Sequence, residues 1–154
     1  MRGGAGPFGG ATDFTDEHYL NLLADVQTLE HKIKQTIEVL DFFSNGTKDI
    51  GIAVDEWAAW YSDTRMPALY QQNTLREGML AAAVFNLFNR YAKKVRMSNI
   101  AQSVNVLGTL CLTRGDRTLL TPTYHVYHMY RSHMENTAVY ADVDSPIVRD
   151  PAPA

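Results

Sequence analysis

Cysteine is almost absent from the sequence, with Cys111 alone among 154 residues. An intrachain disulfide is therefore impossible, which favours a reducing, cytoplasmic location. The apolar neighbours Leu110 and Leu112 predict a buried, unreactive thiol. The sequence also lacks the ~18 uninterrupted apolar residues of a membrane span, and its start lacks the apolar core of a signal peptide.

An excess of basic charge is also lacking. The 14 Lys and Arg residues stand against 17 Asp and Glu, giving a net charge of -3. Without a polybasic segment, neither nucleic acid nor an anionic membrane is an expected partner. A phosphate-binding loop must follow a strand, and no predicted strand precedes the glycines at 3, 4 and 6. No cofactor is therefore expected.

What the sequence does contain is alternating helical and strand-like segments. Apolar periodicity and capping residues predict helices at about 15–43, 71–93 and 121–134, and strands at 50–54, 95–101 and 137–143. Thr15, Asn45 and Thr121 are the expected helix boundaries. The first strand is a short apolar run, typical of a strand buried on both faces. This order predicts an α/β fold with parallel strands and right-handed crossovers.

Two carboxylates, Asp55 and Glu56, directly follow the first predicted strand. Ligand-binding loops converge at the carboxyl ends of parallel strands, so both are candidates for catalysis. Trp57, Trp60 and Tyr61 come next, and flat aromatic rings can stack on the apolar faces of sugars while carboxylates bind hydroxyl groups. These residues therefore indicate a sugar site.

A simpler interpretation of the same residues stays open. An acidic pair after a strand can be a helix cap or a solvated turn, and Trp57 and Trp60 can belong to the core. Gln102 lies at the end of the second predicted strand and could reach the same ligand-binding loops as Glu56.

A second cluster of candidate side chains lies in the last predicted helix. It consists of Tyr124, His125, Tyr127, His128, Tyr130 and His133. His125 and His128 can share one helix face, but His133 points about 140° away from His128. Without a cysteine or carboxylate in the segment, packing on the sheet is favoured over metal binding, and no metal site is predicted.

Several collinear blocks of the sequence resemble family 51 α-L-arabinofuranosidases. They are residues 52–57 with Trp60 and Tyr61, then 69–76, 95–107 and 119–127. The likeness covers roughly residues 10–135. It implies the C-terminal portion of a (β/α)8 TIM barrel, with strands seven and eight at 50–55 and 95–101 and the first helix preceding strand seven.

The resemblance also implies a division of the chain. An irregular segment at 1–12 would precede a partial barrel at 13–135, and residues 136–154 would begin a β-sandwich domain or form a frayed tail.

By the same resemblance, Glu56 would be the nucleophile of a retaining enzyme that removes terminal non-reducing α-L-arabinofuranosyl groups. Gln102 would hydrogen-bond the bound arabinose, Trp60 would form an aromatic wall, and Asp55 and Trp57 would support the site. The expected partner is an arabinofuranosyl-containing oligosaccharide or glycoside, as in arabinan or hemicellulose. Full-length members of the family commonly form homo-oligomers.

The sequence departs from the family pattern at the second catalytic carboxyl group. A retaining glycosidase needs two carboxyl groups ~5 Å apart. The family's acid/base glutamate lies in an Asn-Glu pair after strand four, whereas here only the reversed pair Glu135-Asn136 occurs. A whole barrel needs ~250 residues. We therefore expect the chain alone, a fragment of such a barrel, to be inactive; the alternative is a non-catalytic remnant acting as a sugar-binding or assembly module.

Overall fold

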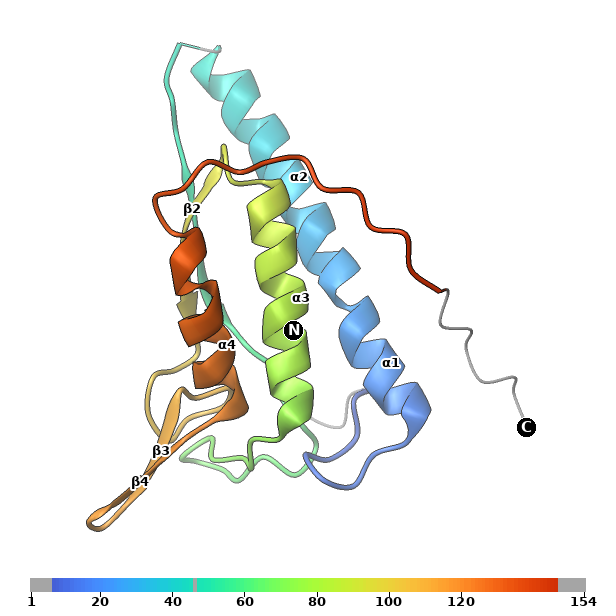
Figure 1. Cartoon of the computed structure of the whole chain (residues 1–154), viewed down its shortest axis with the longest axis vertical. Helices are drawn as coiled ribbons and strands as arrows, with labels where there is room; N and C mark the ends of the chain where they lie inside the picture. The colour runs from blue at the N-terminus through green and yellow to red at the C-terminus, as the bar shows by residue number, and fades with distance from the viewer. Residues whose placement is uncertain (1–6, 46, 147–154) are drawn as a thin grey trace.

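The computed structural model describes residues 7–45 and 47–146. The elements, in chain order, are α1 (Asp16–Ala24), α2 (Val26–Ser44), β1 (Ile52–Trp57), α3 (Leu75–Arg90), β2 (Val95–Ile100), β3 (Cys111–Arg114), β4 (Arg117–Leu120), α4 (Pro122–Tyr130) and the 3-10 turn η1 (Arg131–His133). The helices form one layer in front of β1 and β2, and the β3–β4 hairpin projects from the lower end (Figure 1). In the described ranges, no helix is long and apolar enough to cross a membrane.

The long first helix is present but divided in two at Asp25. Thr15 caps α1 as predicted, because its hydroxyl accepts from the His18 N–H while the His18 ring accepts from the Thr15 N–H. Asn45 ends α2 in the left-handed conformation, also as predicted. Asp25 itself keeps right-handed angles (φ -64°, ψ -14°), so the apolar stripe continues across the break and could not reveal it.

β1 and β2 form a two-stranded parallel sheet, which confirms the predicted strand direction. Ala53 pairs with Met97 and Asp55 with Asn99. β1 begins two residues later than predicted and runs to Trp57, so Asp55 and Glu56 lie within the strand rather than beyond it.

Only one face of this sheet is covered by the described chain. Val54, Trp57, Val95 and Ile100 belong to the core or pack against it on the helix side. Ala53, Asp55, Met97 and Asn99 are exposed on the opposite side, which we call the bare face. The prediction that the first strand is buried on both faces is therefore wrong for the described residues, since α3 and α4 cover one side only.

α3 is shorter than the predicted helix. Thr74 caps it, and its N–H and hydroxyl both donate to the Glu77 carboxylate at 2.7 Å. Leu80, Val84, Leu87 and Phe88 are buried. Leu75, the first residue of the helix, is 72% exposed.

The C-terminal third agrees with the prediction at one helix boundary and differs from it in two places. Thr121 caps α4, with Pro122 at its first position, as predicted. The β3–β4 hairpin was not among the predicted strands. Residues 137–143, predicted as a strand, have no regular structure, because they are exposed and no strand of the described chain pairs with them.

The two chain ends are described only in part. Residues 7–12 are irregular, as predicted, although Phe8 and Ala11 are buried. The rest of the predicted irregular start, 1–6, and residues 147–154 of the predicted tail lie outside the described residues.

Candidate active site at the carboxyl end of the sheet

Three loops meet where β1 and β2 end, at the lower end of Figure 1. They are residues 7–15, 58–74 and 101–110. The Leu107 N–H donates to the Leu69 carbonyl (3.0 Å), and the Asn73 amide donates to the Leu107 carbonyl (2.8 Å). A Cβ on Gly108 would lie 2.7 Å from the Ala58 Cβ, so this close approach requires glycine. The loops after the two strands are therefore joined into one surface.

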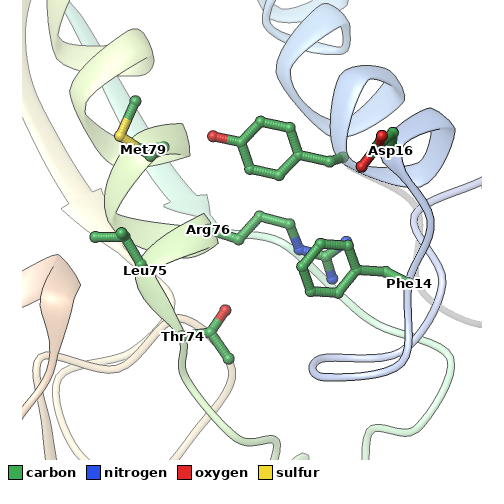
Figure 2. Close-up of a pocket in the computed structure, with 7 residues that line it drawn as sticks. Phe14, Asp16, Thr74, Leu75, Arg76 and Met79 are labelled. Atoms are coloured by element: carbon green, nitrogen blue, oxygen red, sulfur yellow. The ribbon is translucent and has the colours of Figure 1, made fainter. Parts of the chain in front are cut away.

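Arg76 ties the N-terminal loop into the same surface. It is 2% exposed, and its guanidinium donates to the carbonyl oxygens of Phe8 (2.8 Å) and Gly10 (2.7 Å). The guanidinium also lies between the rings of Phe14 and Tyr61, 3.9 and 4.2 Å from their centroids. Figure 2 shows Arg76 reaching from α3 toward Phe14. A buried charge held in this way fixes the segment before α1.

Glu56 lies at a bulge at the end of β1. The register shifts between the Asp55–Asn99 and Trp57–Ile100 pairs, which leaves Glu56 without a cross-strand partner. Its side chain is exposed and its φ is 57°, a left-handed conformation that is rare and costly for a residue with a Cβ. Backbone outliers of this kind concentrate at active sites and ligand-binding loops. The local geometry thus presents a carboxylate at the strand end.

Asp55 and Trp57, on either side of Glu56, have different surroundings. Asp55 is exposed on the bare face and accepts a hydrogen bond from the Asn99 amide. Trp57 is 5% exposed and its indole N–H donates to the Ser98 hydroxyl (2.7 Å). The expectation that the Trp57 ring offers a sugar-stacking surface is therefore wrong, since this ring belongs to the core beneath α3 and α4.

Of the three aromatic residues after Glu56, only Trp60 keeps partial exposure. Tyr61 is buried, and burial raises the pKa of its phenol, as does the neighbouring Glu77 carboxylate. Trp60 is half-buried. The aromatic wall expected from the sequence thus has one candidate left.

Gln102 lies two residues after the end of β2 and is exposed. Its N–H donates to the Val106 carbonyl (3.0 Å), and the Ala101 N–H donates to the Trp57 carbonyl (3.3 Å). The Ala101–Gln102 peptide bond is cis. Because β1 and β2 are parallel neighbours, Glu56 and Gln102 lie at the same end of the sheet.

Sequence reasoning missed a buried polar cluster beneath these loops. Gln71, Arg76 and Glu77 are all buried, and Glu77 Oε1 has no hydrogen-bond partner in the described chain. Burial raises the pKa of the Glu77 carboxyl, partly opposed by its bonds from Thr74. Gln71 and Arg76 lie within the block 69–76 that resembles family 51, which was the only signal available.

The histidine cluster is not organised for metal binding. His125 and His128 are exposed, and the His128 ring stacks on Tyr124. Within residues 7–45 and 47–146, no three His, Cys, Asp or Glu side chains are placed to hold a metal ion. Cys111 is half-buried rather than fully buried, with its thiol 3.8 Å from the Ser103 carbonyl oxygen.

A shallow pocket of about 330 Å³ lies between α1 and α3 (Figure 2). Its lining residues are Phe14, Asp16, Tyr19, Thr74, Leu75, Arg76 and Met79. Glu56, Trp60 and Gln102 are not among them, so none of these three candidate site residues lines the pocket.

Comparison with protein-family models decides the family. The model described as the alpha-L-arabinofuranosidase C-terminal domain matches residues 55–151, which include Glu56, Trp60 and Gln102. The chain belongs to this family. The resemblance to the C-terminal part of family 51 arabinofuranosidases is therefore confirmed, together with its α/β content.

Individual relatives of this arabinofuranosidase domain agree. The chain is 35% identical over 147 residues to an intracellular exo-alpha-L-arabinofuranosidase of Bacteroides ovatus, covering 94% of this chain and 28% of the relative. The GH51 arabinofuranosidase structure from Xanthomonas axonopodis pv. citri has a TM-score of 0.74 at 36% identity, covering 83% of this chain and 26% of that one. The arabinose complex of the Thermotoga maritima alpha-L-arabinofuranosidase has a TM-score of 0.66 at 26% identity, covering 78% and 24%. The chain spans about a quarter of the length of these relatives.

Proposed function

We propose that this chain supplies the nucleophile and part of the sugar site of a retaining α-L-arabinofuranosidase. The observation that carries the proposal is Glu56, an exposed carboxylate on a left-handed bulge where three loops converge. The family membership supplies the reaction class, because the matched relatives are arabinofuranosidases. The substrate would be a terminal non-reducing α-L-arabinofuranosyl group of an oligosaccharide or glycoside.

The bare face of the sheet supports a role within a (β/α)8 barrel. Parallel sheets are normally covered on both faces. In such a barrel, helices cover the outside of the strands and side chains from the other strands fill the inside. β1 and β2 have the helix layer and expose Ala53, Asp55, Met97 and Asn99 on the other face. We therefore assign them as strands seven and eight, with the partial barrel at 13–135 after an irregular 1–12 and a further β-domain or a tail from 136.

In the proposed reaction, the Glu56 carboxylate attacks the anomeric carbon of the arabinofuranosyl group. A carboxylic acid from the remainder of the barrel protonates the leaving oxygen, and water then hydrolyses the glycosyl-enzyme ester with net retention. The Gln102 amide would hydrogen-bond a sugar hydroxyl while the Trp60 ring stacks on the furanose. The relatives named intracellular support a cytoplasmic location.

A chimeric enzyme tests the proposal. This chain would replace the matching region of the Bacteroides ovatus relative, and hydrolysis of an aryl α-L-arabinofuranoside would be measured. We expect an active chimera in which Glu56→Gln lowers kcat about 10⁴-fold. Glu38→Gln, at an exposed position of α2, is the matched control and should leave the rate unchanged. Full activity of the Glu56→Gln chimera would remove the nucleophile assignment.

The alternative is a non-catalytic sugar-binding or assembly module. The bare face favours an assembly role, since Ala53 and Met97 are exposed there on a parallel sheet. A folded chimera without activity, together with binding of methyl α-L-arabinofuranoside by the isolated chain, would support this alternative over catalysis.

A further inference from the structure

A buried glutamine holds the chain on both sides of Trp60. The Gln71 side chain is 2% exposed. Its amide nitrogen donates to the Ala59 carbonyl oxygen (3.1 Å), and its amide oxygen accepts from the Tyr61 N–H (3.3 Å). Ala59 and Tyr61 directly precede and follow Trp60, so one side chain fixes both flanking peptide groups.

Thr64 gives this arrangement a second point of attachment. Its hydroxyl lies 2.8 Å from Gln71 Oε1 and 2.8 Å from the Tyr61 carbonyl oxygen, and can donate to either. The flanking residues Ala59 and Tyr61 are buried, whereas Trp60 is half-buried. The backbone is thus anchored in the interior while the Trp60 ring reaches the surface.

We propose that Gln71 is a positioning residue for Trp60, holding its indole in the orientation needed to stack on a furanose ring. The sugar part rests on the proposed function, whereas the positioning rests on the hydrogen bonds alone. A primary amide fits this place because it both donates and accepts. Alanine at position 71 would leave the Ala59 carbonyl and the Tyr61 N–H unpaired in a buried site, where such groups are costly and the loop would rearrange to reach water.

The two tryptophans of the chain allow a direct spectroscopic test. The ¹⁵N-labelled chain should give two indole N–H signals, and Trp60→Phe identifies the one from Trp60. We expect Gln71→Ala to shift or broaden the Trp60 signal while the Trp57 signal, held by Ser98, stays in place. In a titration with methyl α-L-arabinofuranoside, the wild-type Trp60 signal should move with added sugar, and Gln71→Ala should weaken binding about tenfold.

Two further variants make the result specific. Gln72→Ala changes the adjacent exposed glutamine and should move neither indole signal. Gln71→Glu keeps an acceptor for Tyr61 and Thr64 but places a carboxylate oxygen against the Ala59 carbonyl oxygen, so it should also displace the Trp60 signal. If Gln71→Ala unfolds the chain, so that the Trp57 signal is lost as well, the Gln71→Glu spectrum tests the positioning role instead.

The outcomes separate the two claims. An unchanged Trp60 signal in folded Gln71 variants would overturn the positioning role. A displaced Trp60 signal in these variants, combined with no response of wild-type Trp60 to the sugar, would support the positioning role and contradict the proposed sugar contact.

Discussion

The two faces of the β1–β2 sheet differ in what covers them. On the helix side, the Trp57 ring lies 5.7 Å from the Phe85 centroid and 5.8 Å from the Phe88 centroid, edge to face, and it stacks on Tyr127. On the bare face, Met97 is 58% exposed beside the hydrogen-bonded pair of Asp55 and Asn99. Side chains that alternate along the same strands therefore either pack in the hydrophobic core or stay exposed on the bare face.

This difference between the two faces shows why Glu56, the candidate nucleophile, needs a bulge to be exposed. Regular alternation would place residue 56 on the helix side, where Val54 packs. The bulge breaks the alternation, so Glu56 is exposed while Trp57 still reaches the core. The bulge therefore lets the Trp57 ring pack in the core while the Glu56 carboxylate stays exposed.

The largest expected effect compares one large side chain from each face. Trp57→Ala should lower the free energy of unfolding by about 3–5 kcal/mol, because it opens a cavity in the aromatic core and removes the bond to Ser98. Met97→Ala should change it by less than about 0.5 kcal/mol in the isolated chain. Urea denaturation followed by circular dichroism measures both. Similar losses for the two variants would show that the bare face is covered in solution.

Local signals in the sequence were sufficient for much of the fold. Thr15, Asn45 and Thr121 mark real helix boundaries because capping depends only on residues within one helical turn. The parallel direction of β1 and β2 followed from the helix between them, since a connection of that length crosses the sheet.

What the sequence could not reveal depends on partners distant along the chain. The one-sided cover of the sheet was missed because apolar runs do not specify which neighbours are present. The helix boundary at Asp25 was invisible since the buried stripe continues through it. Gln71 was missed because its hydrogen-bond partners, 7 to 12 residues away, meet it only when the loop folds back.

A smaller effect on stability is expected at Glu77, which is buried whereas Glu56 is exposed. Burial raises the pKa of the Glu77 carboxyl above its ordinary value of 4.5, so the folded state retains a proton that the unfolded state has released. The stabilisation from Glu77 is complete below pH 4.5 and is lost as pH rises through the folded pKa. Glu77→Gln stays neutral and keeps an acceptor for Thr74, so its stability relative to wild type should increase as pH rises above 4.5.

Urea titrations at several pH values between 4.5 and 8 measure this difference. Glu38→Gln on the exposed side of α2 is the control and should show no comparable trend. A constant difference between Glu77→Gln and wild type across the range would mean that folding does not raise the pKa of Glu77.

The smallest effect on stability is expected at Asp55, and it bears most directly on the comparison of the faces. Asp55→Ala removes the bond from Asn99, but the side chain is exposed, so the free energy of unfolding should change by less than about 0.5 kcal/mol. The same bond ties the residue before the bulge to β2, and so fixes the backbone from which Glu56 projects. In the chimera, kcat should therefore fall about tenfold, because small misplacements of a reacting group reduce the rate. Loss of stability without loss of kcat would mean that the bare face contributes to folding, and that the bulge holds Glu56 without Asp55.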